Sequence, residues 1–170
     1  MDTNKLSAQE KQVLHLFLDI CPQWSDVILT QLEFLNVQRS NTSTNYTLLF
    51  QCGSFVPALH VATTMPIEVL LGNVTIIPEP QCKCVSNYSI IDINSNSVFK
   101  ATDTTTVARL YIKSGILLEL EIYSMSGTPL NFSNLDTKQR TYIIHDSELY
   151  TEIINQHFTA DKKTRDGSVS

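Results

Sequence analysis

Two carboxylates stand two residues apart near the middle of the chain, Glu119 and Glu121. On a β-strand, such residues share one face at a separation of about 7 Å, which is within the range of paired catalytic carboxyl groups. Arg109 is predicted to lie opposite Glu121 on a neighbouring strand. An ion-paired, solvent-facing surface therefore explains the two carboxylates better than acid–base catalysis does.

The remaining residues with catalytic potential are scattered. His60 and Cys52 form the only thiol–imidazole combination worth naming, and their nearness in sequence does not show that they meet. Asp146 follows His145 and could orient its imidazole, but capping of a following helix is the simpler role. The chain has no glycine-rich phosphate loop, no G-x-S-x-G elbow and no H-E-x-x-H helix. We expect no catalytic residues, so the protein is predicted not to be an enzyme.

The four cysteines show neither a disulfide scaffold nor a zinc motif. Cys82 and Cys84 are the only close pair, and their C-x-C spacing differs from the C-x₂-C of zinc sites, with no histidine following at ligand spacing. We therefore expect free thiols and no metal or cofactor, although a redox or metal role for this pair stays open.

The paired carboxylates belong to a predicted β-hairpin over residues 107–123. Two alternating runs flank a short loop, and the register follows from the pattern because a shift by one residue would exchange the two faces of a strand. A three-residue loop at 114–116 buries a continuous apolar stripe, whereas a two-residue Ser-Gly turn does not. The predicted buried pairs are Ala108–Ile122, Leu110–Leu120 and Ile112–Leu118, and the predicted outer pairs are Val107–Tyr123, Arg109–Glu121 and Tyr111–Glu119.

The other predicted elements make the chain a single α+β domain over residues 1–160. A capping box at Ser7 and Glu10 opens an N-terminal helix, and Asp146 caps a C-terminal helix. We expect a mostly antiparallel β-sheet with both helices packed on one face, followed by a disordered tail over 161–170. Strands are predicted at 27–37 and 46–52, joined by a long loop, at 74–77, and at 88–93 and 97–100, joined by a turn at 94–96; residues 67–71 and 142–145 fit more than one element.

The formal net charge of −5 argues against the phosphate backbone of nucleic acid as a direct partner, because such binding depends on lysine and arginine. The acidic balance fits a basic partner protein as well as ordinary solubility. Residues 1–4 lack the basic region of a signal peptide, and no run approaches the roughly 20 apolar residues that span a bilayer. We therefore expect a cytoplasmic protein that has no contact with a membrane.

The hairpin and the residues after it carry a resemblance. Residues 111–129 read YIKSGILLELEIYSMSGTP, a strand, a short turn, L-x-E-L-E-I-Y and then S-x-x-G-x-P. This pattern resembles hairpins of small bacterial immunity proteins, the cytosolic antidotes of contact-dependent growth inhibition and related toxin systems. The resemblance covers about an eighth of the chain. It implies a protein that binds a cognate toxin domain, often a nuclease, and blocks its active site, but it assigns no binding residues.

The residues themselves suggest which face would bind such a partner. Tyr111, Glu119, Glu121 and Tyr123 share the outer face of the predicted hairpin, and acidic groups beside aromatic anchors are typical of surfaces that bind a basic protein. A solvated face with no partner explains the same residues.

Two other functions stay open at this point. The first is a small-molecule-binding protein or an enzyme with a pocket between the sheet and the terminal helices, where Cys52, His60 and Tyr46 could meet. The second is a structural subunit of a larger assembly.

Overall fold

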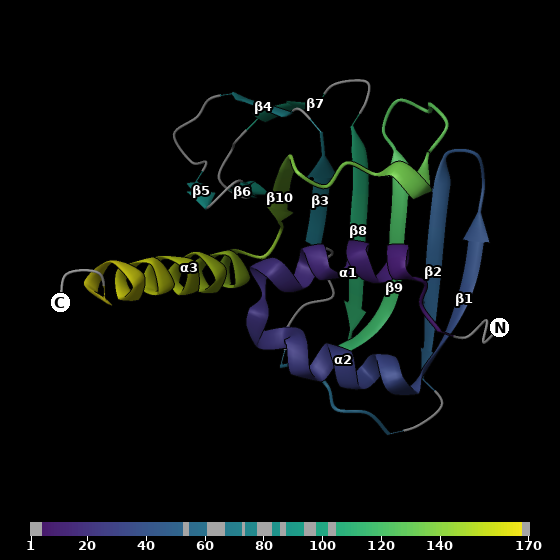
Figure 1. Cartoon of the computed structure of the whole chain (residues 1–170), viewed down its shortest axis with the longest axis horizontal. Coiled ribbons are helices and arrows are strands. Elements are labelled where there is room, and N and C mark those ends of the chain that lie inside the picture. Colours follow the sequence, from purple (N-terminus) through teal and green to yellow (C-terminus); the bar gives the residue numbers. More distant parts are fainter. Residues whose placement is uncertain are drawn as a thin grey trace.

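The computed structural model describes residues 5–52, 55–60, 67–72, 74–77, 83–85, 88–93, 98–101 and 105–167. This part of the chain has the predicted α+β organisation, with helices at both ends of the sequence and strands between them (Figure 1). Its α-helices are α1 (Ala8–Ile20), α2 (Ser25–Phe34) and α3 (Ser147–Gly167). Its strands are β1 (Leu35–Asn41), β2 (Asn45–Cys52), β3 (Ile67–Leu71), β4 (Val74–Ile77), β5 (Lys83–Val85), β6 (Tyr88–Asp92), β7 (Val98–Ala101), β8 (Thr106–Lys113), β9 (Ile116–Ser124) and β10 (Arg140–Ile144).

The main sheet has the strand order β1-β2-β9-β8-β3-β10-β6-β5, and β4 pairs with β7 in a separate two-stranded sheet. Neighbouring strands of the main sheet are antiparallel except β10 and β6, which are parallel. The predicted mostly antiparallel sheet is therefore confirmed. The predicted hairpin is formed by β8 and β9, which lie between β2 and β3.

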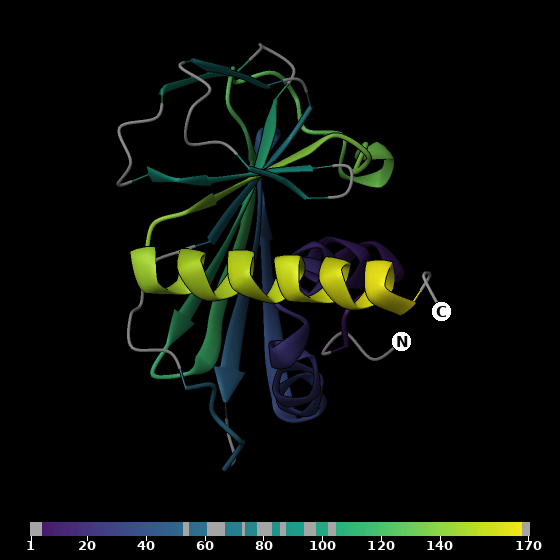
Figure 2. The same cartoon turned by 90° about the vertical axis from the view of Figure 1, so that its left-hand side faces the viewer.

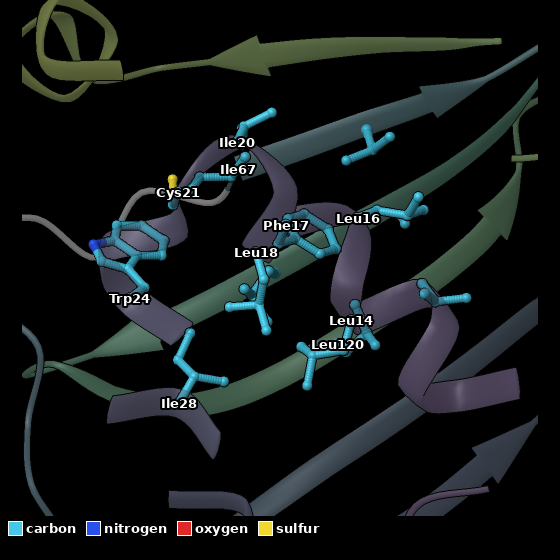
Figure 3. Packing of buried hydrophobic residues seen from close by; sticks show 14 of the residues in the cluster. Leu14, Leu16, Phe17, Leu18, Ile20, Cys21, Trp24, Ile28, Ile67 and Leu120 are labelled. Atoms are coloured by element: carbon cyan, nitrogen blue, oxygen red, sulfur yellow. The ribbon is translucent and has the colours of Figure 1, made fainter. Parts of the chain in front are cut away.

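Helix α1 begins at the predicted capping box. The Ser7 hydroxyl accepts a hydrogen bond from the Glu10 N–H at 3.2 Å, and the Glu10 carboxylate accepts one from the Ser7 N–H at 2.7 Å. Phe17 and Ile20 are fully buried and pack with Trp24 in the main core (Figure 3). Burial of such side chains contributes roughly 1.5–3 kcal/mol each, so apolar packing is what holds α1 on the sheet.

Helix α2 occupies residues for which the sequence predicts a strand. The prediction of a strand over 27–37 is wrong as far as Phe34, and β1 begins only at Leu35. The helix turns Ile28 and Gln31, both 0% exposed, towards the core. Because one of its core positions holds a polar glutamine, the helical period is obscured in the sequence and the apolar content resembles that of a strand.

The buried Gln31 amide joins α2 to the tip of the β8–β9 hairpin. Its Nε2 donates to the carbonyl oxygens of Pro57, at 2.7 Å, and Gly115, at 2.9 Å, while its Oε1 accepts from the Leu117 N–H at 3.0 Å. Gly115 has φ +78°, and a Cβ there would lie 2.2 Å from the Leu59 carbonyl oxygen. This turn therefore requires glycine both for its backbone angle and for its close contact with residues 58–59.

The register of the β8–β9 hairpin agrees with the prediction from Val107, at the end away from the turn, as far as Tyr111. Beyond that point the prediction is wrong, because Ile112 pairs with Leu117 instead of Leu118 and the loop is a two-residue turn at 114–115. A β-bulge accommodates Leu118, which is 41% exposed, whereas Leu117 is 2% exposed. One extra residue in β9 allows the short turn and the buried stripe to coexist, which a regular ladder does not.

The segments 67–71 and 142–145, for which a strand is one of the alternatives, contribute the inner strands β3 and β10. Other elements differ from the expectation. The predicted strands 88–93 and 97–100 do not pair with each other, since β6 pairs with β5 and β10 while β7 pairs with β4. Helix α3 continues to Gly167, into the segment predicted to be a disordered tail. The predicted turn at 94–96 and Cys82 lie outside the described residues.

Candidate functional site

The two faces of the main sheet differ in what covers them. Helices α1 and α2 lie on one side of β2, β8 and β9, and the two views place α3 beside these strands instead of over their other side (Figures 1 and 2). The strand registers show which side chains point to that other side. We call this surface the open face; its exposed and partly exposed residues include Asn45, Thr47, Leu49, Glu68, Arg109, Tyr111, Lys113, Glu119, Glu121 and Tyr123.

The open face brings together the four residues that the sequence singles out. Tyr111 lies opposite Glu119, and Arg109 opposite Glu121, while Tyr123 follows on the same face of β9. Its three carboxylates outnumber its two cationic side chains, Arg109 and Lys113, so the face has a net negative charge. It is a sheet surface, and the cavities whose lining is described lie elsewhere in the molecule. Such a surface suits a protein partner better than an enclosed substrate.

Arg109 corrects one part of the predicted surface. Although it lies opposite Glu121 as expected, its Nε binds the carboxylate of Glu68 on the other neighbouring strand, at 2.7 Å. Its guanidinium carbon also lies 5.0 Å from the centre of the Tyr123 ring, in a cation–π contact. The predicted Arg109–Glu121 ion pair is therefore absent from the described structure, and Arg109 instead fixes Glu68 and Tyr123.

Among the described residues, Glu119 and Glu121 are consequently left without an ion-pair partner. Asn45 Nδ2 donates to Glu121 Oε1 at 3.1 Å, and neither carboxylate forms an ion pair with any described residue. Partial burial raises the pKa of Glu119, and the negative charge of Glu121 raises that pKa further. A cation placed between them would relieve both effects.

Glu68 is the residue of this site that the sequence argument missed. It lies on β3, far from the hairpin in sequence, so no local pattern connects it with Arg109. The available signal is a charged residue between Ile67 and Val69, both of which are buried. A glutamate inside such an apolar strand indicates an ion-pair partner on a neighbouring strand.

The structure does not gather the three residues of the predicted pocket. Tyr46 and Cys52 lie at opposite ends of β2, about 20 Å apart along the strand. The Tyr46 hydroxyl donates to Glu10 at 2.6 Å, and its ring stacks on Phe132 with 4.2 Å between the centroids. Tyr46 is thus a structural residue at the other end of the strand from Cys52.

His60 lines a cavity of its own, at the junction of the helices. The cavity measures about 350 Å³, and its walls include Trp24 and Leu149. Asp146 and Glu152 supply carboxylates there, and Asp146 Oδ1 accepts from the Leu149 N–H at 2.8 Å as the predicted helix cap. This cavity is the part of the molecule that fits the small-molecule hypothesis.

Within the described residues, no group of three or more histidine, cysteine, aspartate or glutamate side chains is arranged to hold a metal ion. No described helix is both long enough and apolar enough to cross a membrane. Comparison of the chain with models of protein families, with curated proteins and with solved structures finds no match.

Proposed function

We propose that this protein is an immunity protein that binds a cognate toxin domain through the open face and occludes the toxin's active site. The observation that carries the proposal is the pair Glu119 and Glu121, which is partly buried, has no ion-pair partner among the described residues and lies beside Tyr111 and Tyr123. The hairpin that displays this pair is also the stretch that resembles immunity proteins. In this proposal the protein acts in the cytoplasm without catalysis or a cofactor.

A basic partner explains the chemistry of the open face. A lysine or arginine placed against Glu119 and Glu121 would favour their ionised forms and form charge-assisted hydrogen bonds with them. Tyr111 and Tyr123 would supply aromatic anchors, which are enriched among residues that dominate binding energy. Toxin domains that act on nucleic acid need basic surfaces, so an acidic antidote would be steered to the surface that it must block.

The test begins with co-expression of the protein and the neighbouring reading frame, followed by affinity capture, native mass measurement and a growth assay. We expect a one-to-one complex and rescue of growth from the toxin. The double variant Glu119→Lys/Glu121→Lys should slow association about 10-fold or more at low salt, because the face becomes basic. Its matched control is Glu33→Lys/Glu152→Lys, which changes the net charge equally at exposed residues outside the open face.

The control distinguishes the effect of where the charge is changed from the effect of the change in total charge. Equal slowing by both double variants would leave only a general charge effect and would contradict the choice of the open face. An unchanged association rate in the folded Glu119→Lys/Glu121→Lys protein would contradict it as well. Circular dichroism of each variant establishes that the fold is retained.

A small-molecule-binding protein is the second candidate, and the cavity beside His60 is the observation that favours it. Its volume falls within the range of ligand pockets, and it combines apolar walls from Trp24 and Leu149 with carboxylates. This function replaces the first if co-expression captures no protein, growth is not rescued and a ligand screen by thermal shift gives a hit that His60→Ala abolishes.

A further inference from the structure

A groove lies between α1 and α2 and reaches the start of β1. Its volume is about 830 Å³. Leu14 and Leu18 of α1 form its buried floor, at 2% and 6% exposure, whereas Leu29 and Phe34 on the α2 side are 44% and 52% exposed. The described structure therefore leaves large apolar side chains in solvent beside an apolar floor, which is the usual mark of an interaction site.

The spacing of the groove residues matches a helix. Leu14 and Leu18 are one turn apart on α1, as are Leu29 and Leu32 on α2, so each wall presents a ridge with helical repeat. From Lys11 to Leu18 the groove extends about 10 Å along α1, which is close to two helical turns. A third helix laid between α1 and α2 could place side chains at positions i, i+3 or i+4, and i+7 on this floor.

The charges along the groove are asymmetric. The α1 side carries Lys5 and Lys11, with His15 one turn beyond Lys11, while the α2 side carries Glu33. Lys5, Lys11 and Glu33 are exposed, and none of them has an ion-pair partner among the described residues. In a protein with a net charge of −5, this rim is a place where an acidic segment can approach favourably.

We infer that this groove docks an amphipathic helix from a partner protein, whose apolar face covers Leu29 and Phe34 and whose acidic flank lies along Lys5 and Lys11. The groove lies on the helical side of the sheet and the open face on the other, so this partner surface is separate from the proposed toxin site. The inference does not depend on the proposed function. A partner bound here and a toxin bound on the open face would occupy different sides of one molecule.

The probe is a synthetic amphipathic peptide with leucines at helical spacing and glutamates along one flank, held helical by a side-chain cross-link and labelled for fluorescence anisotropy. A second peptide carries lysines in place of the glutamates. The protein variants are Leu29→Glu and Lys11→Glu, and the matched control is Leu118→Glu, since Leu118 is 41% exposed on β9. Amide chemical shifts of the full chain locate the binding site.

We expect saturable binding of the acidic peptide, with shift changes confined to α1 and α2. Leu29→Glu and Lys11→Glu should each weaken it about 10-fold or more, whereas Leu118→Glu should leave it unchanged. The inference is overturned if the acidic peptide does not saturate, if the lysine peptide binds as tightly, or if all three variants behave alike. It is also overturned if the free protein forms a dimer that Leu29→Glu abolishes, because a second copy would then fill the groove.

The same variants distinguish this inference from the proposed function. Leu29→Glu and Lys11→Glu should still capture the toxin, since neither residue lies on the open face. Loss of toxin capture in these folded variants would overturn the assignment of the two partners to separate sides.

Discussion

Two carboxylates, one on each side of the main sheet, differ in how the surrounding groups compensate the burial of their charge. On the helical side, Glu10 is 1% exposed and receives Arg39 Nε at 2.6 Å and the Tyr46 hydroxyl at 2.6 Å. Burial alone would raise the pKa of Glu10, but hydrogen bonds from Arg39, Tyr46 and Ser7 and the charge of Arg39 together lower it. On the open face, burial and a second carboxylate both raise the pKa of Glu119.

The difference indicates what each group is for. The surroundings of Glu10 are complete within the chain, and they connect the start of α1 to β1 and β2. Those of Glu119 include no cation among the described residues, so a cation from a partner would favour its ionised form. Glu10 therefore serves the stability of the fold, whereas recognition is the role that we propose for Glu119, and the following variants test that division.

The first comparison sets Arg39, which binds Glu10 of α1, against Arg109, which binds Glu68 of β3, and a large effect is expected at Arg39. Arg39→Met should lower the free energy of unfolding by about 3 kcal/mol, because it leaves the buried Glu10 without its cation. Arg109→Met should lower it by about 1 kcal/mol or less, since its partner Glu68 is less buried, at 13% exposure. Urea unfolding with an unchanged m-value measures both. Equal losses of unfolding free energy would show that the two ion pairs contribute equally to stability, which would contradict the division.

Adjacent leucines at the β-bulge give the next comparison. Leu117→Ala should lower the free energy of unfolding by roughly 2–4 kcal/mol, because it opens a cavity in the core. Leu118→Ala should change it by less than about 0.5 kcal/mol, since that side chain is exposed. The same denaturant titration measures this pair. A larger loss of unfolding free energy for Leu118→Ala than for Leu117→Ala would favour the register predicted from the sequence, in which Leu118 is buried.

The bulge shows where reasoning from the sequence succeeds and where it stops. The alternating pattern around Leu110 and Leu120 is enough to set the register, because one wrong step would expose the apolar stripe. The pattern does not contain the extra residue at Leu118, and it does not show that the turn lies against residues 58–59, where the Leu59 N–H donates to the Gly115 carbonyl oxygen. Local periodicity therefore predicts the hairpin, whereas the structure of its tip also involves a contact with a segment that is distant in sequence.

The same limit applies to the candidate site. Tyr111, Glu119, Glu121 and Tyr123 are placed on one face by strand alternation alone. The partner of Arg109 depends on β3 pairing with β8 across a long stretch of sequence, and no local rule selects Glu68 over Glu121. The sequence thus identifies the residues of the open face but not which carboxylates lack a cation, and that second point carries the proposal.

The smallest expected effect is that of Glu119→Gln, and its sign is opposite to that of Glu10→Gln. A raised pKa means that the folded state disfavours the charged form of Glu119, so Glu119→Gln should slightly increase the free energy of unfolding at pH 7. That gain should fade as the pH falls through the raised folded pKa and vanish below the ordinary value of 4.5.

The lowered pKa of Glu10 predicts the reverse trend. Glu10→Gln should be less stable than the wild type at pH 7, and the deficit should shrink only below pH 4.5. Urea unfolding of both variants between pH 3 and pH 7 measures these trends. If Glu119→Gln is destabilising at pH 7, the ionised form of Glu119 is stabilised within the chain. That result would contradict the proposal that Glu119 needs a cation from a partner.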